Sequence, residues 1–410
     1  MEFLSNRVLT MSESETLAMT RIARELKDSG IDVISLSIGE PDFNTPEEIK
    51  EFAKKAVDEN WSHYPPVPGY PELRKAISAK FKRDNQLDYT PEQIVVSTGA
   101  KQSIYQVVMA LVNPGEEVII PTPYWVSYKE IVKVAEGIPV YVKATIENDF
   151  KITPEQLRRA ITPKTKLIMF SSPSNPTGML YTKEELKAMA EVVKDYPHIF
   201  IMADEIYEHI NFEGKHESIA QFDFIKEQVI TINGVAKGFA MTGWRIGFIG
   251  APLSIAKACG KLQGQVTSAA CSIAQRATIK AMEMDPATSE DIIGMREAFR
   301  KRRDMVYGLL KEIPGFDVRL PQGAFYFFPD VSALYGKRVP EDSVFVNTYG
   351  KNRIENSDDM CMYLLYDAHV AAVQGSAFGD ENCIRFSYAT SEDKLIEAVR
   401  RVKEAVLKLD

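Results

Sequence analysis

A lysine among small and apolar residues is the clearest sign of chemistry in this sequence. Lys237 lies within residues 231–247, eight residues before Arg245. Burial or a nearby cation disfavours the charged form of a lysine, and only the neutral amine attacks a carbonyl carbon to form an imine. The setting therefore predicts a reactive lysine, although a solvated lysine beside a structural arginine would leave the same local pattern.

Three further segments place polar or small residues directly after short apolar runs. Residues 98–102 (Thr-Gly-Ala-Lys-Gln) precede a helical pattern, so their backbone N–H groups would form a phosphate site at a helix N-terminus. Asn175 lies between prolines that would fix the direction of its amide, and Asp204 is followed three residues later by Tyr207. Taken singly, each segment is also explained by a rigid turn, a helix cap or surface polarity.

Together these groups match the needs of a phosphorylated pyridine aldehyde. Such a cofactor needs a lysine that traps its carbonyl, a carboxylate that keeps the ring nitrogen protonated, donors to its ring oxygen and a cradle for its phosphate. In that order, the sequence offers Lys237, Asp204, Asn175 with Tyr207, and Arg245 with the turn at Gly99. The sequence therefore predicts a site for pyridoxal 5′-phosphate.

The elements that would position these residues alternate along the chain. Short apolar runs indicate buried strands at residues 94–96, 117–120, 166–170, 199–203 and 229–232. Amphipathic segments between them, such as those that open at Pro71 and at Lys183, indicate helices. The alternation predicts an α/β fold with a mainly parallel sheet covered by helices, in which ligands gather beyond the carboxyl ends of the strands.

From Pro286 onward the pattern changes. A long helical pattern covers residues 289–311 and leads to the aromatic stretch 323–328 and to a C-terminal helix at 391–409. These features predict a second, smaller α+β domain. The polar stretch 336–358 is expected to be a loop-rich insertion.

Composition narrows the class of protein. A chain of 410 residues with 45% apolar content exceeds what one core usually supports, so two domains are expected. A net charge of -8 with interspersed basic residues argues against a nucleic-acid partner. Neither the four cysteines nor the five histidines have the spacing of metal ligands or of a disulfide framework. No secretory signal and no apolar run of membrane-spanning length are visible, so we expect a cytoplasmic enzyme without a membrane partner.

Motifs spread over nearly the whole chain resemble those of the fold-type-I, class I/II aminotransferases that use pyridoxal phosphate. They are Ser37-Ile-Gly-Glu-Pro-Asp-Phe43, Tyr64-Pro-Pro-Val-Pro-Gly69, Pro123-Tyr-Trp-Val126, Asn175-Pro-Thr-Gly178, Asp204-Glu-Ile-Tyr207, Lys237 with Arg245, and Arg385-Phe-Ser-Tyr-Ala-Thr390. The Asn-Gly-x-Ala-Lys motif that ends at Lys237 is similar to that of one group of bacterial aspartate aminotransferases. The resemblance implies a large cofactor domain at 46–285, a small domain made of 1–45 and 286–410, and a homodimer with active sites at its interface.

The resemblance also implies roles for the residues around the cofactor ring. Lys237 would be the Schiff-base lysine and the proton shuttle, and Asp204 would hold the protonated pyridine nitrogen. Tyr207 and Asn175 would bind the ring oxygen. Trp125 would stack on the ring, although its residue type alone would indicate an aromatic side chain in the core or an interface.

The phosphate cup is implied by the same resemblance. Its members would be Arg245, the turn at Gly99, Ala100 and Lys101, and the partner subunit's Tyr64. Many relatives have serines at the positions of Gly234 and Ala236, where this chain has no hydroxyl. The arginine and the turn are therefore expected to supply more of the phosphate contact.

The substrate contacts complete the implied site. They would come from Gly39, Trp125, Asn175, Arg385, Lys101, Ser14 and Thr16. Arg385 would clamp the α-carboxylate bidentately, with help from the backbone at Gly39. Lys101, with the hydroxyls of Ser14 and Thr16, would bind the distal carboxylate of a dicarboxylic substrate, because an unpaired buried carboxylate is costly. By residue type alone, Lys101 would face solvent and Arg385 would form a structural salt bridge.

These roles predict a ping-pong transamination, in which L-aspartate leaves as oxaloacetate and 2-oxoglutarate then leaves as L-glutamate. We also expect open and closed forms, with the N-terminal segment acting as a lid. Three alternatives remain open: another substrate such as alanine, an aromatic amino acid or prephenate; a β-lyase; and a cofactor-binding regulatory protein. The combination of Lys237, Asp204 and Arg385 argues against the last, since a pure binder needs no proton shuttle.

Overall fold

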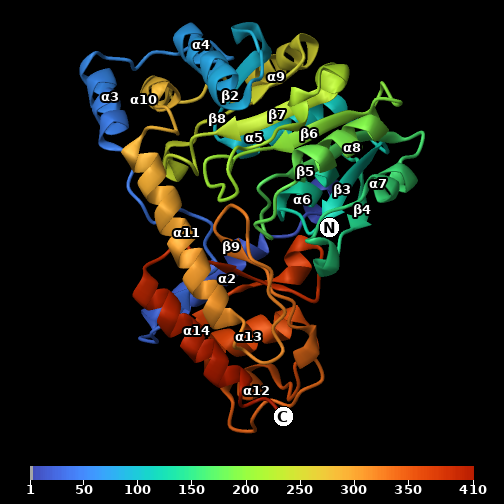
Figure 1. The fold of residues 1–410 in the computed structure, drawn as a ribbon, viewed down its shortest axis with the longest axis vertical. Coiled ribbons are helices and arrows are strands. Elements are labelled where there is room, and N and C mark those ends of the chain that lie inside the picture. The colour runs from blue at the N-terminus through green and yellow to red at the C-terminus, as the bar shows by residue number, and fades with distance from the viewer. Residues whose placement is uncertain (1–2) are drawn as a thin grey trace.

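A seven-stranded sheet forms the centre of the larger part of the molecule (Figure 1). The computed structural model describes residues 3–410, so the first two residues of the predicted range 1–45 lie outside the described residues. In spatial order the strands are β2 (Ile94–Ser97), β8 (Gly247–Gly250), β7 (Val229–Gly234), β6 (Phe200–Asp204), β5 (Thr165–Ser171), β3 (Glu117–Thr122) and β4 (Ile138–Lys143). Strand β8 runs antiparallel to both neighbours, whereas β7, β6, β5, β3 and β4 pair in parallel. The predicted α/β fold with a mainly parallel sheet is therefore confirmed.

Two strands of this sheet, β4 and β8, are absent from the sequence-based prediction. Strand β4 lies at the edge of the sheet, and several of its side chains are exposed. Strand β8 has only two apolar residues between Gly247 and Gly250. Neither has the continuous apolar run by which strands buried on both faces are found.

Successive residues of each central strand face opposite sides of the sheet. In β5, Leu167 and Met169 belong to one hydrophobic cluster, whereas Ile168 and Phe170 belong to another. The first cluster is covered by α5 (Ala100–Leu111), α6 (Ser127–Val134) and α9 (Leu253–Val266), and the second by α3 (Glu47–Asp58), α4 (Pro71–Lys80), α7 (Pro154–Ala160), α8 (Lys183–Val193) and α10 (Ser272–Glu283). Within residues 3–410, no helix combines the length and the apolar character needed to cross a membrane.

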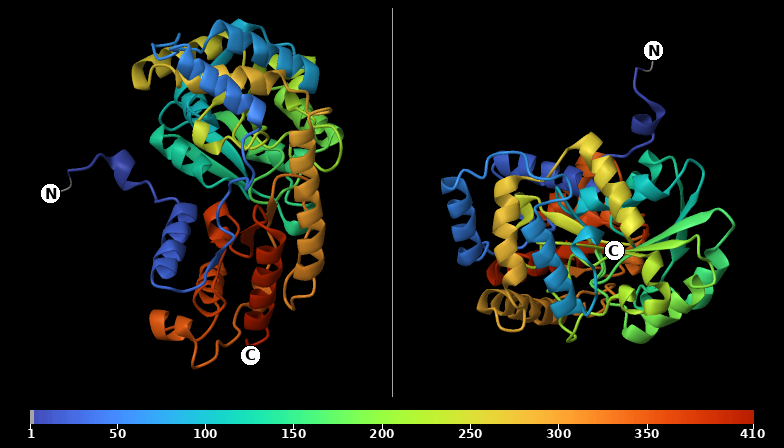
Figure 2. Two further views of the ribbon diagram at one scale, coloured as in Figure 1. Left: turned by 90° about the vertical axis from the view of Figure 1, so that its left-hand side faces the viewer. Right: turned by 90° about the horizontal axis from the view of Figure 1, so that it is seen from above.

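The long helix α11 (Glu290–Leu310) leads from this sheet to a smaller group of elements (Figure 1). This group contains β9 (Tyr326–Phe327), β10 (Val370–Ala371), β11 (Val373–Gln374), β12 (Ile384–Ser387), α12 (Val344–Tyr349), α13 (Ser357–Asp367) and α14 (Glu392–Val406). The N-terminal segment joins it, because β1 (Ile34–Ser35) pairs in parallel with β10 and α2 (Glu15–Asp28) buries Met19 and Ala23 in the same hydrophobic cluster. The short helix α1 (Asn6–Leu9) precedes α2 and projects from the body of the molecule (Figure 2).

The stretch 336–358 is not simply a loop-rich insertion. It contains α12 and the start of α13, and Phe345 of α12 is fully buried. The backbone N–H of Phe345 donates to the Ser343 hydroxyl and to the Asp367 carboxylate, which together cap the helix. Most of the stretch is loop, as expected, but α12 was missed because a six-residue helix, stabilised by one buried aromatic and two capping groups, is too short to show a periodic pattern.

Candidate active site

A pocket of about 270 Å³ lies where β5, β6 and β7 end, between the large sheet and the smaller group of elements. It brings together most of the predicted site residues: Ser14, Thr16, Gly39, Ala100, Lys101, Trp125, Asn175, Asp204, Tyr207, Lys237, Arg245 and Arg385. Gly99 adjoins the pocket through its contact with Arg245. Tyr64 is 95% exposed and does not line the pocket of its own chain.

Lys237 follows strand β7 and forms part of the pocket wall. Its Nζ donates a hydrogen bond to the carbonyl oxygen of Gly39 at 2.5 Å. Burial lowers the pKa of Lys237 to about 8; Glu40 opposes this shift, while Arg385 and Arg245 add to it. The amine is therefore neutral more often near pH 8 than an ordinary lysine, as nucleophilic attack and proton transfer require.

Asp204 is the last residue of β6, and its carboxylate is buried at the pocket. Its Oδ2 accepts a hydrogen bond from the Tyr128 hydroxyl at 2.8 Å, and its Oδ1 accepts one from the backbone N–H of Ile206 at 3.3 Å. Burial raises the pKa of Asp204 to about 6, although both hydrogen bonds act to lower it. A protonated ring nitrogen beside this carboxylate would favour the ionised form.

Tyr128 is a site residue that sequence reasoning did not identify. It lies in α6, three residues after Trp125, and the two rings meet edge to face with centroids 5.6 Å apart. Its nearness in the chain to the motif Pro123-Tyr-Trp-Val126 was the available signal. Nothing in the local sequence indicates that the Tyr128 hydroxyl reaches Asp204.

Tyr207 lies in the turn after β6 and points toward the smaller group of elements. Its hydroxyl is 2.8 Å from the hydroxyl of Tyr326 in β9, a second residue that the sequence did not reveal. Burial, with Tyr326 beside it, holds the pKa of Tyr207 well above its usual value. The Tyr326 ring lies under the Arg385 guanidinium, with 4.5 Å between the guanidinium carbon and the ring centroid.

Arg385 is a buried cation that lacks a carboxylate partner within residues 3–410. It lies in β12, is 2% exposed and takes part in no ion pair with a described side chain. Its two terminal nitrogens donate to Oδ1 of Asn175 at 2.9 Å and to the carbonyl oxygen of Ser37 at 2.6 Å, while its Nε has no hydrogen-bond partner. Because a buried charge without a counter-ion is costly, this arrangement favours the binding of an anion. The alternative that Arg385 forms a structural salt bridge, which its residue type alone would suggest, does not hold for the described residues.

Asn175 connects this cation to the pocket. The side chain is 6% exposed, and its Oδ1 is already used by Arg385. Its Nδ2 makes no hydrogen bond with the described residues and remains available to a ligand oxygen. The predicted orientation of this amide by the surrounding prolines is thus reinforced by the arginine.

The turn before α5 forms a tight cradle with Arg245. Gly99 caps α5 with a φ of +81°, and a Cβ added there would lie 2.4 Å from a terminal nitrogen of Arg245. A Cβ added to Gly247 of β8 would lie 2.2 Å from the backbone nitrogen of Ala100. Only glycines allow these backbones and the guanidinium to approach so closely. A helix N-terminus beside a guanidinium is suited to a phosphate group, so the residues present fit pyridoxal 5′-phosphate.

The missing hydroxyl at Gly234 has a steric explanation, whereas nothing in the structure explains the one missing at Ala236. A Cβ added to Gly234 would lie 2.9 Å from the carbonyl oxygen of Ile246 and 3.0 Å from the Cα of Gly247. A serine at position 234 would therefore require β7 and β8 to separate. The close pairing of these strands leaves Arg245 and the α5 N-terminus as the donors at this end.

Lys101, Ser14 and Thr16 line the same pocket from α5 and from the start of α2. The Lys101 ammonium lies 4.9 Å from the centroid of the Trp125 ring. Burial, followed by the charge of Arg245, lowers the pKa of Lys101. A second anion in this pocket would thus meet one further cation and two hydroxyl groups.

Known proteins resemble this chain over nearly its whole length. The family model described as aminotransferase class I and II matches residues 31–402. The chain is 47% identical over 404 residues to an aspartate aminotransferase of Geobacillus stearothermophilus, covering 97% of this chain and 98% of that relative. It is 44% identical over 412 residues to an aspartate/prephenate aminotransferase of Cereibacter sphaeroides, covering 98% of each. The solved aspartate aminotransferase from Rhizobium meliloti matches with a TM-score of 0.94 and 41% identity, over 100% of both chains.

Proposed function

Because this chain belongs to the class I and II aminotransferase family and is a pyridoxal 5′-phosphate-dependent enzyme, we propose that it transfers the amino group of L-aspartate to 2-oxoglutarate by a ping-pong mechanism. The proposed products are oxaloacetate and L-glutamate. One observation carries the proposal: Lys237, Asp204 and Arg385 line the same pocket. A reactive amine, a buried carboxylate and an unpaired guanidinium are what the cofactor and an amino acid together require.

Each residue proposed to hold the cofactor ring would contact a different part of it. When bound, pyridoxal 5′-phosphate supplies a carbonyl that takes up amines and a ring that accepts the electron pair left on the substrate Cα. Asp204 would hold the proton of the ring nitrogen, and Tyr207 with Asn175 would donate to the ring oxygen. Trp125 would cover one face of the ring.

The phosphate would bind to the backbone of Gly99, Ala100 and Lys101 and to Arg245. This assignment follows from the cradle that these residues form at the N-terminus of α5. The partner subunit's Tyr64 would complete the cup in a homodimer. The exposure of Tyr64 in a single chain supports this role, because its side chain is free to reach another subunit.

Lys237 is the group that we assign to proton transfer. Its Nζ would take the proton from the substrate Cα and return it to the carbon that held the cofactor carbonyl. A pKa of about 8 suits an amine that must both accept and release a proton near neutral pH. The Gly39 carbonyl that accepts its hydrogen bond lies in the N-terminal segment, which links this segment to the reacting centre.

Substrate selection would depend on two cations in the pocket. Arg385 would bind the α-carboxylate, since it is buried and has no counter-ion among residues 3–410. Lys101, with Ser14 and Thr16, would bind the distal carboxylate of aspartate or of 2-oxoglutarate. One pocket then accepts both dicarboxylic acids, as a ping-pong exchange demands.

Prephenate is the second candidate substrate. One relative is named an aspartate/prephenate aminotransferase, and prephenate also carries a second carboxylate that Lys101 would bind. The pocket, of about 270 Å³, is partly open, and Ser14 and Thr16 of the N-terminal segment form part of its wall, so the position of this segment would limit the size of the substrate. We propose that this segment is a lid that moves between open and closed forms.

The chain organisation that we propose has a large cofactor domain at 46–285 and a small domain made of 1–45 and 286–410. Separate hydrophobic clusters support it, because the clusters on the two faces of the large sheet differ from the one shared by α2, α11, α13 and α14. We further propose a homodimer in the cytoplasm. The four cysteines are free thiols, as is usual in a reducing compartment.

Steady-state kinetics test this function directly. Aspartate, glutamate, alanine and phenylalanine are compared as donors to 2-oxoglutarate, and prephenate is compared as an acceptor. Lys237→Ala should abolish turnover, and Lys101→Ala should lower kcat/KM for aspartate on the order of 100-fold, with little effect on alanine, which has no distal carboxylate. Full activity in the first variant, or unchanged aspartate turnover in the second, would contradict the proposal.

A further inference from the structure

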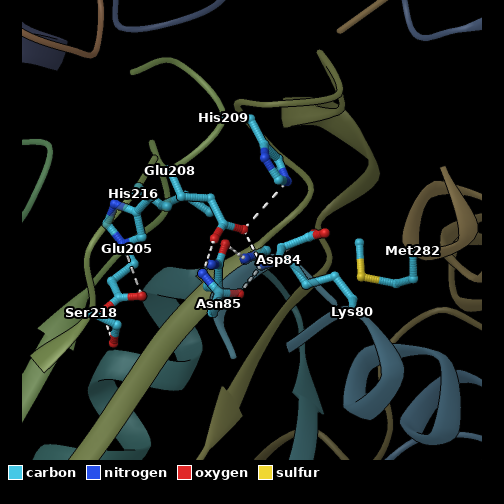
Figure 3. A network of polar contacts seen from close by, with 12 residues as sticks. Lys80, Asp84, Asn85, Glu205, Glu208, His209, His216, Ser218 and Met282 are labelled. Carbon is cyan, nitrogen blue, oxygen red and sulfur yellow. Dashed lines mark hydrogen bonds and ion pairs between the residues drawn. The ribbon is translucent and has the colours of Figure 1, made fainter. Parts of the chain in front are cut away.

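A buried polar network includes side chains of the turn that follows β6 (Figure 3). Its members are Lys80, Asp84, Asn85, Glu205, Glu208, His209, His216 and Ser218. Lys80 is 1% exposed, Glu208 is 5% exposed, and the two form a hydrogen-bonded ion pair. No step of the proposed reaction uses these side chains.

Glu208 is the centre of this network. Its Oε1 accepts from the Lys80 ammonium and lies 3.3 Å from Nε2 of His209, and its Oε2 accepts from Nδ2 of Asn85 at 2.7 Å. Lys80 also donates to Oδ1 of Asn85 at 2.7 Å. Burial is the largest single influence and would raise the pKa of Glu208, but Lys80, the two neighbouring histidines and the hydrogen bond from Asn85 together outweigh it and hold the pKa well below its usual value. The carboxylate is thus ionised and bound from three sides.

A second arm of the network holds Glu205. Its Oε1 accepts from the Ser218 hydroxyl at 2.6 Å, and its Oε2 lies 3.1 Å from Nε2 of His216. Burial acts to lower the pKa of His216, but the charge and hydrogen bond of Glu205, together with the charge of Glu208, outweigh it and raise the pKa. The three side chains Glu205, Glu208 and His216 are close enough to suggest metal ligands. Because both oxygens of Glu208 already face protein donors, ion pairs account for the arrangement better than a metal ion.

The network and the pocket share one short segment of chain. Glu205 directly follows Asp204, and Glu208 directly follows Tyr207. The side chains of Asp204 and Tyr207 line the pocket, whereas those of the two glutamates enter the network. Any rotation of this turn that released the glutamates would also move both cofactor-facing side chains.

His209 extends the same connection to the reactive lysine. A Cβ added to Gly238 would lie 2.7 Å from Cδ2 of His209, so the imidazole packs directly against the residue after Lys237. The ring also meets Phe239 edge to face, with centroids 5.4 Å apart. Burial lowers the pKa of His209 to about 4, so a neutral imidazole fills this space at neutral pH.

We infer that the Lys80–Glu208 ion pair positions the residues that hold the cofactor. It fixes the 204–209 turn and, through His209, the backbone beside Lys237. The turn and the lysine therefore keep a constant position relative to each other. This inference rests on the proposed function, in which Asp204, Tyr207 and Lys237 hold the cofactor. The ion pair joins residues 128 apart in the sequence, from α4 to the turn after β6. Lys80 and Glu208 are positioning residues, since neither lines the pocket.

The test separates positioning from general stability. Three variants are compared with the wild type: Lys80→Met, Glu208→Gln, and the double variant Lys80→Met/Glu208→Leu, which removes both charges so that no unpaired ion remains buried. Ile77→Ala is the matched control, because Ile77 is fully buried on the same helix α4 but makes no contact with the network by hydrogen bond or charge. The readouts are the Tm of the apo-protein, its Kd for pyridoxal 5′-phosphate, the pH titration of the absorbance of the bound cofactor, and kcat and KM.

If the inference is right, the network variants raise the cofactor Kd and shift the absorbance titration, and kcat falls on the order of tenfold or more while KM changes little. The double variant should recover Tm relative to the single variants and still bind the cofactor weakly. Ile77→Ala should lower Tm, but the absorbance of its bound cofactor should titrate with pH as in the wild type. A wild-type Kd and titration in the double variant would overturn the inference, as would an equal shift in Ile77→Ala. Failure of the aspartate assignment would instead appear as a changed donor in the wild type, with these cofactor readouts unaffected.

Discussion

The Tyr128 hydroxyl donates a 2.8 Å hydrogen bond to Oδ2 of Asp204, and both side chains are buried. The tyrosine thus stabilises the charged form of the carboxylate that we assign to the ring nitrogen. It also lies edge to face with Trp125, the residue proposed to cover the ring. One helix, α6, therefore supports two sides of the cofactor site.

The first prediction concerns this hydrogen bond. Tyr128→Phe keeps the ring contact with Trp125 and removes only the hydroxyl. A hydrogen bond to a charged group contributes about 1.5–3 kcal/mol, so the Kd for pyridoxal 5′-phosphate should rise by roughly tenfold or more. Equilibrium binding to the apo-protein measures this change. Tyr105→Phe, on α5 and outside the pocket, serves as a control that should bind like the wild type.

The second prediction concerns how the stability of the apo-protein depends on pH. The folded-state pKa of Asp204 is raised to about 6 from a model-peptide value near 3.8, so its contribution to stability is greatest below pH 4 and is lost as pH rises to 6. Asp204→Asn removes this loss. The free energy of unfolding of the variant, relative to wild type, should therefore increase between pH 4 and pH 7 by about 2 kcal/mol. Urea unfolding of both apo-proteins at each pH measures the difference, and a constant difference would contradict the assignment.

The third prediction concerns the phosphate cradle. Gly99 and Gly115 have almost the same φ, +81° and +82°, but an added Cβ meets Arg245 only at Gly99 and nothing within 4 Å at Gly115. Both Gly→Ala variants should lose stability of about 1 kcal/mol from backbone strain. Only Gly99→Ala should also weaken cofactor binding, because it displaces the guanidinium. Thermal unfolding and cofactor titration separate the two effects; equal cofactor affinities in the two variants would disprove the cradle.

The fourth prediction concerns the unpaired cation. Arg385→Lys keeps the charge but cannot bind Asn175, Ser37 and a carboxylate at once, because it lacks the planar fork of donors. We expect kcat/KM for aspartate to fall on the order of 100-fold. The cofactor Kd should stay close to that of wild type, which distinguishes lost substrate binding from a damaged site. Unchanged inhibition by a dicarboxylate such as maleate would argue against this role.

Local sequence was enough to indicate many of the pocket residues. Lys237, Asp204 and the Gly99 turn each follow a strand that its apolar run reveals, and parallel strands bring their carboxyl ends to one edge of a sheet. The same logic failed for β4 and β8, whose short or partly exposed sequences carry no such run. Arg385, Ser14, Thr16 and Lys101 were found by resemblance to a family, since their local sequences would suit an ordinary surface or salt-bridge residue.

The tertiary structure alone decided which groups act on one another. Periodicity reports whether a residue is buried, but a hydrogen bond depends on distances between atoms that the chain brings together from far apart. Tyr128 reaches Asp204 across 76 positions, and Lys80 reaches Glu208 across 128. In the same way, the sequence by itself determined that Arg385 is a fixed positive charge, whereas only the folded chain decided that this charge is buried without a carboxylate among the described residues and so is available to a substrate.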